Sequence, residues 1–312
     1  MRYLDVDGVR VSAIGLGTWQ FGSRAWGYGA DYAVRIAPAL VRRALELGIT
    51  LIDSAEVYGF GESERIVARG LAAAGPDLAG GAFVATKLLP ILPLPSIVAA
   101  RAAGSRDRLE VTAIDLYQLH WPNPIVPART QAAGLRRLLD TGIARHVGVS
   151  NHGLGRWRAM ESALRRPIIS NQVRFSLASP SPRWDLVPYA AERSRLVIAY
   201  SPLAQGLLAS GERPAGSGAG SRRVRAPLRD AARRRARPLL AAVREIASAH
   251  GATLAQVALA WVISHPNTAA IPGARTLEQL EENAAAADLV LAPQELAWLT
   301  AEAERFDAAR RL

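Results

Sequence analysis

An acid and a phenol stand five positions apart in this chain, and with a cation they would form a group that handles a proton. Asp53 closes the short apolar run Thr50–Asp53, and Tyr58 follows in a loop that contains Gly59. A run of this kind is typical of a buried parallel strand. Asp53 would then lie at the carboxyl end of the strand, where α/β folds carry their chemistry.

Lys87 is the only lysine among the 38 Lys and Arg residues of the chain. It ends a second apolar run, Phe83–Lys87. The position of this single lysine could be a matter of chance, which is the alternative to a chemical role. An amine, however, can shift its pKa when buried and acts as a compact donor, whereas a guanidinium stays charged in a rigid fork. We therefore interpret Lys87 as a position where an amine is chemically required.

A nearby ammonium would make Tyr58 a usable acid. A phenol of ordinary pKa, about 10, donates its proton poorly near neutrality. Lys87 would stabilise the phenolate and lower that pKa, while Asp53 would hold the ammonium charged and oriented. Tyr58 would then protonate a carbonyl oxygen as that oxygen gains negative charge. His120, which ends the run Leu116–His120, would hydrogen-bond the same oxygen.

Eight apolar runs alternate with helical patterns, and this alternation predicts a parallel sheet. Eight such units indicate an α/β fold, a closed (β/α)8 TIM barrel, in one domain over residues 1–312. Asp7-Gly8 predicts an N-terminal β-hairpin, and Pro293–Arg305 predicts an extra C-terminal helix. The expected strands are Val11–Gly17, Thr50–Asp53, Phe83–Lys87, Leu116–His120, Val147–Ser150, Ile169–Gln172, Leu196–Tyr200 and Thr268–Ile271.

An open doubly wound sheet is the competing fold. It requires a glycine-rich phosphate turn after the first strand and a helix that starts in register. Here Gly15-Leu16-Gly17 leads into Thr18-Trp19 without that turn, so the sequence favours the barrel.

The helices expected between the strands are Pro38–Leu47, Glu62–Ala74, Pro95–Leu109, Thr130–Thr141, Arg156–Arg165, Trp184–Arg193, Arg237–His250 and Thr253–Ser264.

Composition argues against several classes of protein. The chain has no cysteine, which removes disulfides, thiol catalysis and the commonest zinc ligands. The histidines other than His120 show no metal-ligand spacing, so we predict no metal. No apolar run reaches the roughly 18 residues of a membrane span. The N-terminus lacks the apolar centre of a signal peptide, and we expect a cytoplasmic protein without membrane contact.

The net charge of +11 is concentrated in one segment. Eight arginines fall in Arg222–Arg237, after the Gly/Ser-rich stretch Pro214–Ser221, and no aromatic residue is interleaved with them. A nucleic-acid binder should have a wider basic footprint, so we expect no nucleic-acid partner. We interpret the segment as a solvated loop; a contribution to phosphate binding is the alternative.

Three segments resemble the catalytic tetrad of the aldo-keto reductase superfamily, with Asp53, Tyr58, Lys87 and His120 as its members. They are Ile52-Asp53-Ser54-Ala55-Glu56-Val57-Tyr58-Gly59, Ala85-Thr86-Lys87 and Asp115-Leu116-Tyr117-Gln118-Leu119-His120-Trp121. Further matches run in the family's order across nearly the whole chain: Gly148-Val149-Ser150-Asn151, Asn171-Gln172, Ala199-Tyr200-Ser201-Pro202-Leu203 and Ile271-Pro272-Gly273-Ala274-Arg275.

The resemblance implies a barrel that binds a nicotinamide cofactor, NADP(H), without a Rossmann fold. By family position, Asn151 and Gln172 would hold the nicotinamide carboxamide, and Tyr200 would stack on its ring. Arg275 suits a 2′-phosphate, which favours NADPH over NADH. The expected cofactor set is Gly17, Thr18, Ser150, Asn151, Gln172 and Tyr200, with Ser201, Leu203 and Gly206 along the pyrophosphate and Gly273, Arg275, Gln279, Glu282 and Asn283 around the adenosine end.

Without the resemblance, several of these residues would be ordinary. Ser150, Asn151 and Gln172 would be polar residues at strand ends. Three tryptophans either pack in the core or rim, or form walls of a substrate pocket: Trp19, Trp26 and Trp121.

The sequence therefore predicts an NADPH-dependent reductase of a small-molecule aldehyde or ketone. Hydride would pass to the carbonyl carbon, Tyr58 would protonate the oxygen, and Lys87 and Asp53 would tune Tyr58. Two rivals remain: an aldolase-type barrel with Lys87 as a Schiff-base lysine, and a cofactor-sensing regulatory subunit of the same fold. Neither substrate identity nor oligomeric state has a signal in the sequence.

Overall fold

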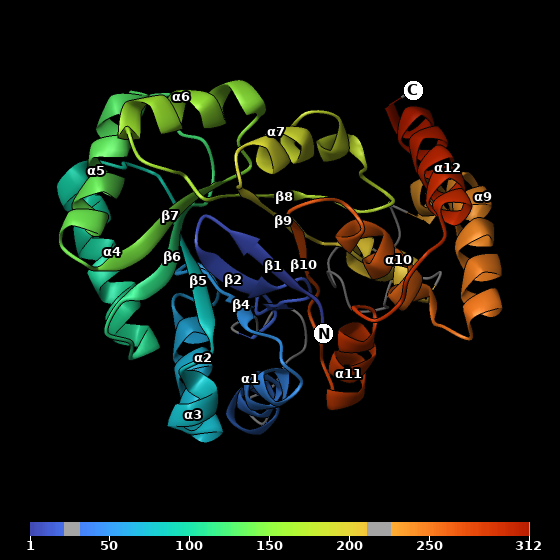
Figure 1. Cartoon of the computed structure of the whole chain (residues 1–312), viewed down its shortest axis with the longest axis horizontal. Helices are drawn as coiled ribbons and strands as arrows, with labels where there is room; N and C mark the ends of the chain where they lie inside the picture. Colours follow the sequence, from blue (N-terminus) through green and yellow to red (C-terminus); the bar gives the residue numbers. More distant parts are fainter. Residues whose placement is uncertain (22–31, 211–225, 312) are drawn as a thin grey trace.

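The computed structural model describes residues 1–21, 32–210 and 226–311. Eight parallel strands form one sheet in the order β10-β9-β8-β7-β6-β5-β4-β3. A parallel bridge between Ile14 and Ala270 joins its two edges, where the amide of Gly15 donates to the carbonyl of Ala270 at 2.7 Å. The sheet nearly closes on itself with helices around it, which confirms the (β/α)8 barrel (Figure 1).

Seven of the eight expected strands appear close to their predicted positions, and the first is wrong. Val11–Gly17 is divided between a hairpin strand and the first barrel strand. The strands are β1 (Tyr3–Val6), β2 (Val9–Ser12), β3 (Leu16–Gly17), β4 (Leu51–Asp53), β5 (Phe83–Leu88), β6 (Ile114–Leu119), β7 (Ala144–Ser150), β8 (Ser170–Arg174), β9 (Leu196–Tyr200) and β10 (Thr268–Ile271).

The antiparallel hairpin β1–β2 covers the amino-terminal end of the barrel, as Figure 1 shows at its centre. Its turn places Asp7 and Gly8 at φ 49° and 78°, the positive values that two-residue hairpin turns require. Val6, Val9 and Val11 are buried there, each contributing about 1.5–3 kcal/mol through burial. Their neighbours in one apolar cluster are residues from the strand beginnings, among them Leu51, Phe83, Ile169 and Leu196.

The opposite, carboxyl-terminal end is therefore left for the chemistry, as expected of this barrel type. The helices that surround the sheet follow the predicted alternation. They are α1 (Ala37–Glu46), α2 (Glu62–Ala74), α3 (Pro76–Ala79), α4 (Pro95–Leu109), α5 (Ala128–Asp140), α6 (Leu154–Leu164), α7 (Leu186–Glu192), α8 (Leu207–Ser210), α9 (Ala226–His250), α10 (Leu254–Ile263), α11 (Leu277–Ala285) and α12 (Pro293–Arg311).

Local sequence explains where these helices begin and end. α1 carries Pro38 in its first turn, buries Leu40 and Val41, and is followed by Gly48 at φ 78°. α10 begins with a capping box, in which Thr253 accepts from the amide of Gln256 and the Gln256 side chain accepts from the amide of Thr253. The extra C-terminal helix is confirmed as α12.

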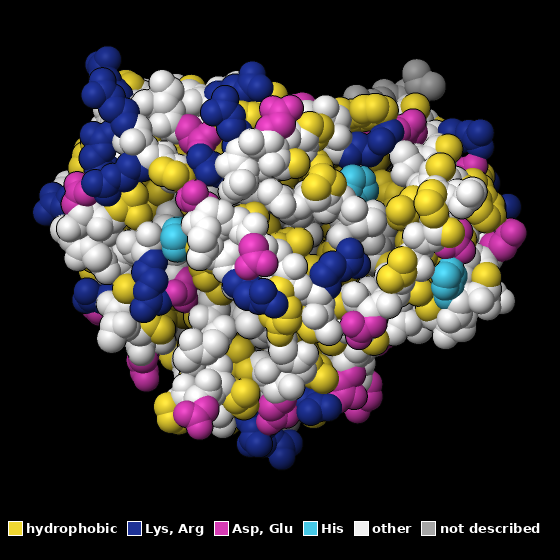
Figure 2. All heavy atoms as spheres, viewed as in Figure 1, with side chains coloured by type: hydrophobic (Ala, Val, Ile, Leu, Met, Phe, Trp, Pro, Cys, Tyr) yellow, Lys and Arg dark blue, Asp and Glu magenta, His cyan; other side chains and the backbone are white. Residues whose placement is uncertain are grey.

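The arginine-rich segment differs from the expectation of a loop. α9 begins at Ala226, so the second half of Arg222–Arg237 is helical. The first half lies outside the described residues. Figure 2 shows acidic and basic side chains interspersed over the face that carries the hairpin.

Among the described residues, no single helix is long and apolar enough to cross a membrane. The helical segments Arg234–His250 and Leu254–Ile263 reach the length and apolar composition of a membrane span only when they are counted together. A bend of 97° separates them.

Candidate active site

Asp53 and Lys87 form a buried ion pair at the carboxyl ends of β4 and β5. Lys87 Nζ donates to Asp53 Oδ2 at 2.7 Å, and the Lys87 and Asp53 side chains are 0% and 2% exposed, respectively. Nζ also donates to the carbonyl of Ser54 at 2.6 Å. Because an ammonium has three N–H groups, one remains for a further acceptor.

Tyr58 lies over this free side of the ammonium. Its ring centroid is 4.9 Å from Lys87 Nζ, and the loop after β4 brings it there. The chain turns at Gly59 and Gly61, which take φ of 60° and 85°, before α2 begins. The positive φ at both positions favours glycine, so the loop geometry depends on residue type.

The protonation states of this cluster follow from burial and mutual charge. Burial raises the pKa of Tyr58, and the opposing effect of Lys87 does not overcome it. The expected lowering of the tyrosine pKa is therefore wrong, because desolvation of the phenol outweighs the effect of the ammonium. Burial acts to lower the pKa of Lys87, but Asp53 and Tyr58 together raise it, so the ammonium stays charged.

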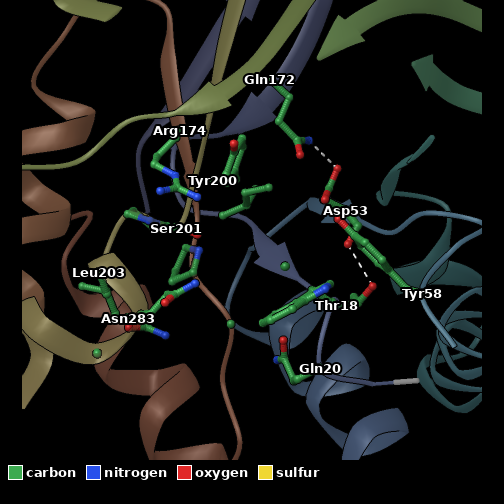
Figure 3. A pocket seen from close by; sticks show the side chains of 18 of the residues that line it. Thr18, Gln20, Asp53, Tyr58, Gln172, Arg174, Tyr200, Ser201, Leu203 and Asn283 are labelled. Atoms are coloured by element: carbon green, nitrogen blue, oxygen red, sulfur yellow. Dashed lines mark hydrogen bonds between the residues drawn. The ribbon is translucent and has the colours of Figure 1, made fainter. Parts of the chain in front are cut away.

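Asp53 binds a second donor as well as the ammonium. Gln172 Nε2, from β8, donates to Asp53 Oδ1 at 2.7 Å (Figure 3). Burial raises the pKa of Asp53, while Lys87 and Gln172 act in the opposite direction. Both carboxylate oxygens accept a hydrogen bond, which favours the ionised form and fixes the carboxylate orientation.

His120 is a neutral imidazole beside the phenol. Its ring packs edge-to-face against Tyr58 with centroids 5.8 Å apart. Burial, followed by the charge of Lys87, lowers the pKa of His120 to about 3. Its Nδ1 is buried and has no partner among the described residues. The imidazole is therefore uncharged at neutral pH and offers one N–H as a donor.

A cavity of about 1230 Å³ opens above this cluster. The cavity exceeds the roughly 300–1,000 Å³ of common small-ligand sites, which suits a large cofactor together with a substrate. Asp53, Tyr58 and His120 line it, whereas Lys87 lies behind them. Every residue expected at the cofactor also lines it: Gly17, Thr18, Ser150, Asn151, Gln172, Tyr200, Ser201, Leu203, Gly206, Gly273, Arg275, Gln279, Glu282 and Asn283.

The ends of β7, β8 and β9 form a connected polar group within this cavity. Tyr200 donates its hydroxyl hydrogen to Asn151 Oδ1 at 2.9 Å. Asn151 Nδ2 donates to the carbonyl of His120 and to Ser150 Oγ, both at 3.0 Å. Asn151 adopts φ 59°, which turns its side chain back toward the barrel mouth. An aromatic face next to amide groups is suited to a flat ring that carries a carboxamide.

The chain after β9 has an unusual backbone. Ser201, Ala204, Gln205 and Gly206 all have positive φ, between 49° and 93°. The backbone turns sharply here, and the amides of Ala204 and Gly206 donate to the carbonyls of Ser201 and Leu203 at 2.9 and 3.0 Å. Ser201 and Leu203 lie on the side of the cavity away from Asp53 and Tyr58 (Figure 3). Ser201, Leu203 and Gly206, the residues expected along a pyrophosphate, all line the cavity in this turn.

Two glycines allow the cavity floor to form. A Cβ on Gly17 would lie 2.8 Å from the carbonyl oxygen of Ile271, and one on Gly273 would lie 2.7 Å from Gln20 Oε1. Gln20 Nε2 in turn donates to the carbonyl of Ala274 at 2.9 Å. The close approach of these segments explains why glycine stands at both positions.

The beginning of α11 forms the far end of the cavity. Thr276 caps the helix by accepting from the amide of Gln279, and Gln279 Oε1 accepts from the amide of Arg275 at 2.9 Å. Arg275 is exposed beside this helix start. A cation close to free helix N–H groups is a suitable place for a phosphate.

Of the three tryptophans expected near the substrate, two line the cavity mouth and one lies outside the described residues. Trp19 and Trp121 line the cavity and are 46% and 48% exposed. Trp26 lies outside the described residues. Phe60, which the sequence did not single out, also lines the cavity and is 94% exposed. Such a residue can be recognised by the exposure of an aromatic side chain at the cavity rim, which only the structure reveals.

Arg174 and Gln20 are the most informative cavity residues that sequence reasoning missed. Arg174 stands two positions after Gln172 on the same strand, so the two side chains share a face. This spacing of two residues could have predicted from the sequence that Arg174 faces the cavity with Gln172. Gln20 follows β3 in an irregular segment and had none.

Among the residues with described positions, no group of three or more His, Cys, Asp or Glu side chains could hold a metal ion.

The barrel, the buried Asp–Lys pair beside a tyrosine and the large cavity match what the resemblance implies for an aldo-keto reductase. The model of the Aldo/keto reductase family matches residues 13–303. The chain therefore belongs to the Aldo/keto reductase family.

Individual relatives extend over nearly the whole chain. An uncharacterized oxidoreductase of Mycobacterium tuberculosis is 51% identical over 308 residues, 98% of this chain and 94% of that protein. The methylglyoxal reductase of Escherichia coli strain K12 is 34% identical and covers 93% of this chain and 90% of its own length.

A solved structure of an aldo-keto reductase from Klebsiella pneumoniae in complex with NADPH superposes with a TM-score of 0.76. It is 30% identical, and the match covers 96% of this chain and 94% of that one.

Proposed function

We propose that this protein is an NADPH-dependent oxidoreductase that reduces an aldehyde or ketone to an alcohol. The observation that carries the proposal is the buried pair of Lys87 and Asp53 under Tyr58, at one end of a cavity large enough for a dinucleotide. Supporting it, the related Klebsiella enzyme was crystallised with NADPH.

Tyr58 is the general acid in this proposal. Its raised pKa keeps it protonated at neutral pH, so it holds a proton ready for a carbonyl oxygen. When the proton leaves, the ammonium of Lys87 stabilises the phenolate that forms. Asp53 keeps Lys87 charged and oriented, and the neutral His120 donates a hydrogen bond to the same carbonyl oxygen.

The other end of the cavity binds the cofactor. NADPH, when bound, supplies a hydride to the carbonyl carbon. Asn151 and Gln172 hold the carboxamide, Tyr200 stacks on the ring, and Ser201, Leu203 and Gly206 lie along the pyrophosphate. Arg275 binds the 2′-phosphate, which is the basis for NADPH preference.

The buried pair argues against an aldolase. A Schiff-base lysine must present a neutral amine to a carbonyl. Lys87 is 0% exposed, and all but one of its N–H groups donate to Asp53 and Ser54. Its raised pKa keeps the amine protonated.

A binding titration followed by turnover tests the proposal. We expect NADPH to bind more tightly than NADH, measured by quenching of tryptophan fluorescence, and a panel of aldehydes and ketones to consume the bound reductant. Tight NADPH binding with no turnover on any carbonyl would favour the regulatory-subunit alternative. Absence of binding to either nucleotide would refute the proposal.

A further inference from the structure

Arg174 carries a charge that the proposed chemistry does not use. It is the last residue of β8, it is exposed, and it lines the cavity. Its guanidinium carbon lies 5.9 Å from the centroid of the Tyr200 ring. Figure 3 shows its side chain beside Tyr200, in the same part of the cavity as Ser201.

Among the described residues, no acidic side chain forms an ion pair with this cation. In the described part of the chain, Arg174 forms neither a salt bridge nor a side-chain hydrogen bond with another residue. Glu282 also lines the cavity, from α11, but no ion pair joins the two. Glu62, another lining residue, is engaged by Arg69 at 2.9 Å.

The remaining ionisable groups near the strand ends sum to no net charge. The ammonium of Lys87 is offset by the carboxylate of Asp53, with which it is paired. Burial lowers the pKa of His120 to about 3, so that imidazole is neutral. Within the parts of the chain that the structure describes, Arg174 is therefore an uncompensated charge near the aromatic ring of Tyr200.

This placement matters because the two redox forms of the cofactor differ in charge at one ring. The nicotinamide is positively charged in NADP⁺ and neutral in NADPH. A fixed cation beside the ring's place on Tyr200 repels the oxidised form and leaves the reduced form unaffected. The guanidinium also withdraws electron density from the Tyr200 face, which weakens its attraction for a cationic ring.

We propose that Arg174 makes the site discriminate between the redox states of the cofactor, so that NADP⁺ is bound more weakly than NADPH. The inference rests on the proposed function, which places the nicotinamide against Tyr200. Weak binding of the oxidised form raises the reduction potential of the bound couple and promotes release of the spent cofactor after hydride transfer.

The size of the effect follows from the position of the charge. Arg174 is exposed, so water screens it, and we expect about a three- to tenfold contribution to the ratio of the two dissociation constants. A tenfold change in this ratio corresponds to about 30 mV in the reduction potential of the bound two-electron couple. The contribution should shrink at high salt, because screening lengths fall.

The test measures the dissociation constants of NADP⁺ and NADPH for the full-length protein and three variants, by fluorescence titration at low salt. Arg174→Met should lower the ratio of the NADP⁺ constant to the NADPH constant by about three- to tenfold. Arg174→Lys should keep the ratio because it keeps the charge. Arg166→Met is the matched control, since Arg166 is paired with Asp140 outside the cavity, and should change nothing.

Two results would overturn the inference. An unchanged ratio in Arg174→Met, with both forms still bound, would show that the charge does not act at the nicotinamide. An equal weakening of both forms would show that Arg174 binds a cofactor phosphate instead. Failure of the unmodified protein to bind either form would refute the proposed function itself, which is a separate outcome.

Discussion

The buried pair of Asp53 and Lys87 makes a sharp prediction about stability. In Lys87→Met, the carboxylate of Asp53 loses its counterion while remaining 2% exposed, and the carbonyl of Ser54 loses a donor. Breaking a buried pair in this way costs about 3–5 kcal/mol of unfolding free energy. The double variant Asp53→Asn/Lys87→Met leaves no buried charge and should recover most of that loss.

The loss in Lys87→Met should also depend on pH. Burial raises the pKa of Asp53, and removing Lys87 raises it further because an opposing charge is gone. A carboxyl whose pKa is higher in the folded state than in the unfolded state stabilises the fold at low pH and loses that effect as pH rises through the folded pKa. The difference from the unmodified protein should therefore shrink as pH falls from 8 toward the ordinary carboxyl pKa of about 3.9.

Urea denaturation at several pH values measures both effects. Arg166→Met serves as the exposed control, since its pair with Asp140 is worth about 0–1 kcal/mol. A loss below about 1 kcal/mol in Lys87→Met, independent of pH, would refute a charged buried pair. Equal losses in the single and double variants would refute the coupling between the two side chains.

Two further predictions concern binding and pH. Arg275→Met should weaken NADPH by about 10- to 100-fold while changing NADH less than about twofold, because only NADPH carries the 2′-phosphate; fluorescence titration checks this, and equal losses would contradict it. Burial lowers the pKa of His120 to about 3, so the imidazole does not titrate between pH 5 and 8. Between pH 5 and 8, the pH profile of kcat/KM should therefore have the same inflections in the unmodified protein and in His120→Asn. An inflection in this range that disappears in His120→Asn would contradict a neutral imidazole.

Much of the fold could be predicted because its signals are local. The helices Glu62–Ala74 and Pro95–Leu109 match α2 and α4 at both ends, since glycine or proline marks their starts. The strand Val11–Gly17 was wrong because two short strands follow each other without a turn signal. Between them, the chain at Gly15 passes close to β4, where a Cβ would lie 2.8 Å from the carbonyl oxygen of Leu51.

The sequence allowed most residues of the candidate site to be predicted, but not the direction of the pKa shift of Tyr58. Polar residues at the ends of apolar runs indicated Asp53 and Lys87, since parallel strands of a barrel share one mouth. The direction of the pKa shift of Tyr58 depends on how completely the loop after β4 buries the phenol, which no residue spacing encodes. Arg174 was missed because the apolar Val173 extends β8 past Gln172, where the strand was expected to end.

The substitution Tyr58→Phe tests the central claim most directly, because it removes the proposed acid and nothing else. The NADPH dissociation constant should stay within about twofold, and the unfolding free energy from urea denaturation within about 1 kcal/mol, of the unmodified protein, since the phenol hydroxyl makes no hydrogen bond to the cofactor-side residues described above. Hydride transfer to a carbonyl, followed as loss of NADPH under single-turnover conditions, should fall by about 10²- to 10⁴-fold. Turnover within tenfold of the unmodified protein, with NADPH still bound, would contradict the assignment of Tyr58 as the general acid.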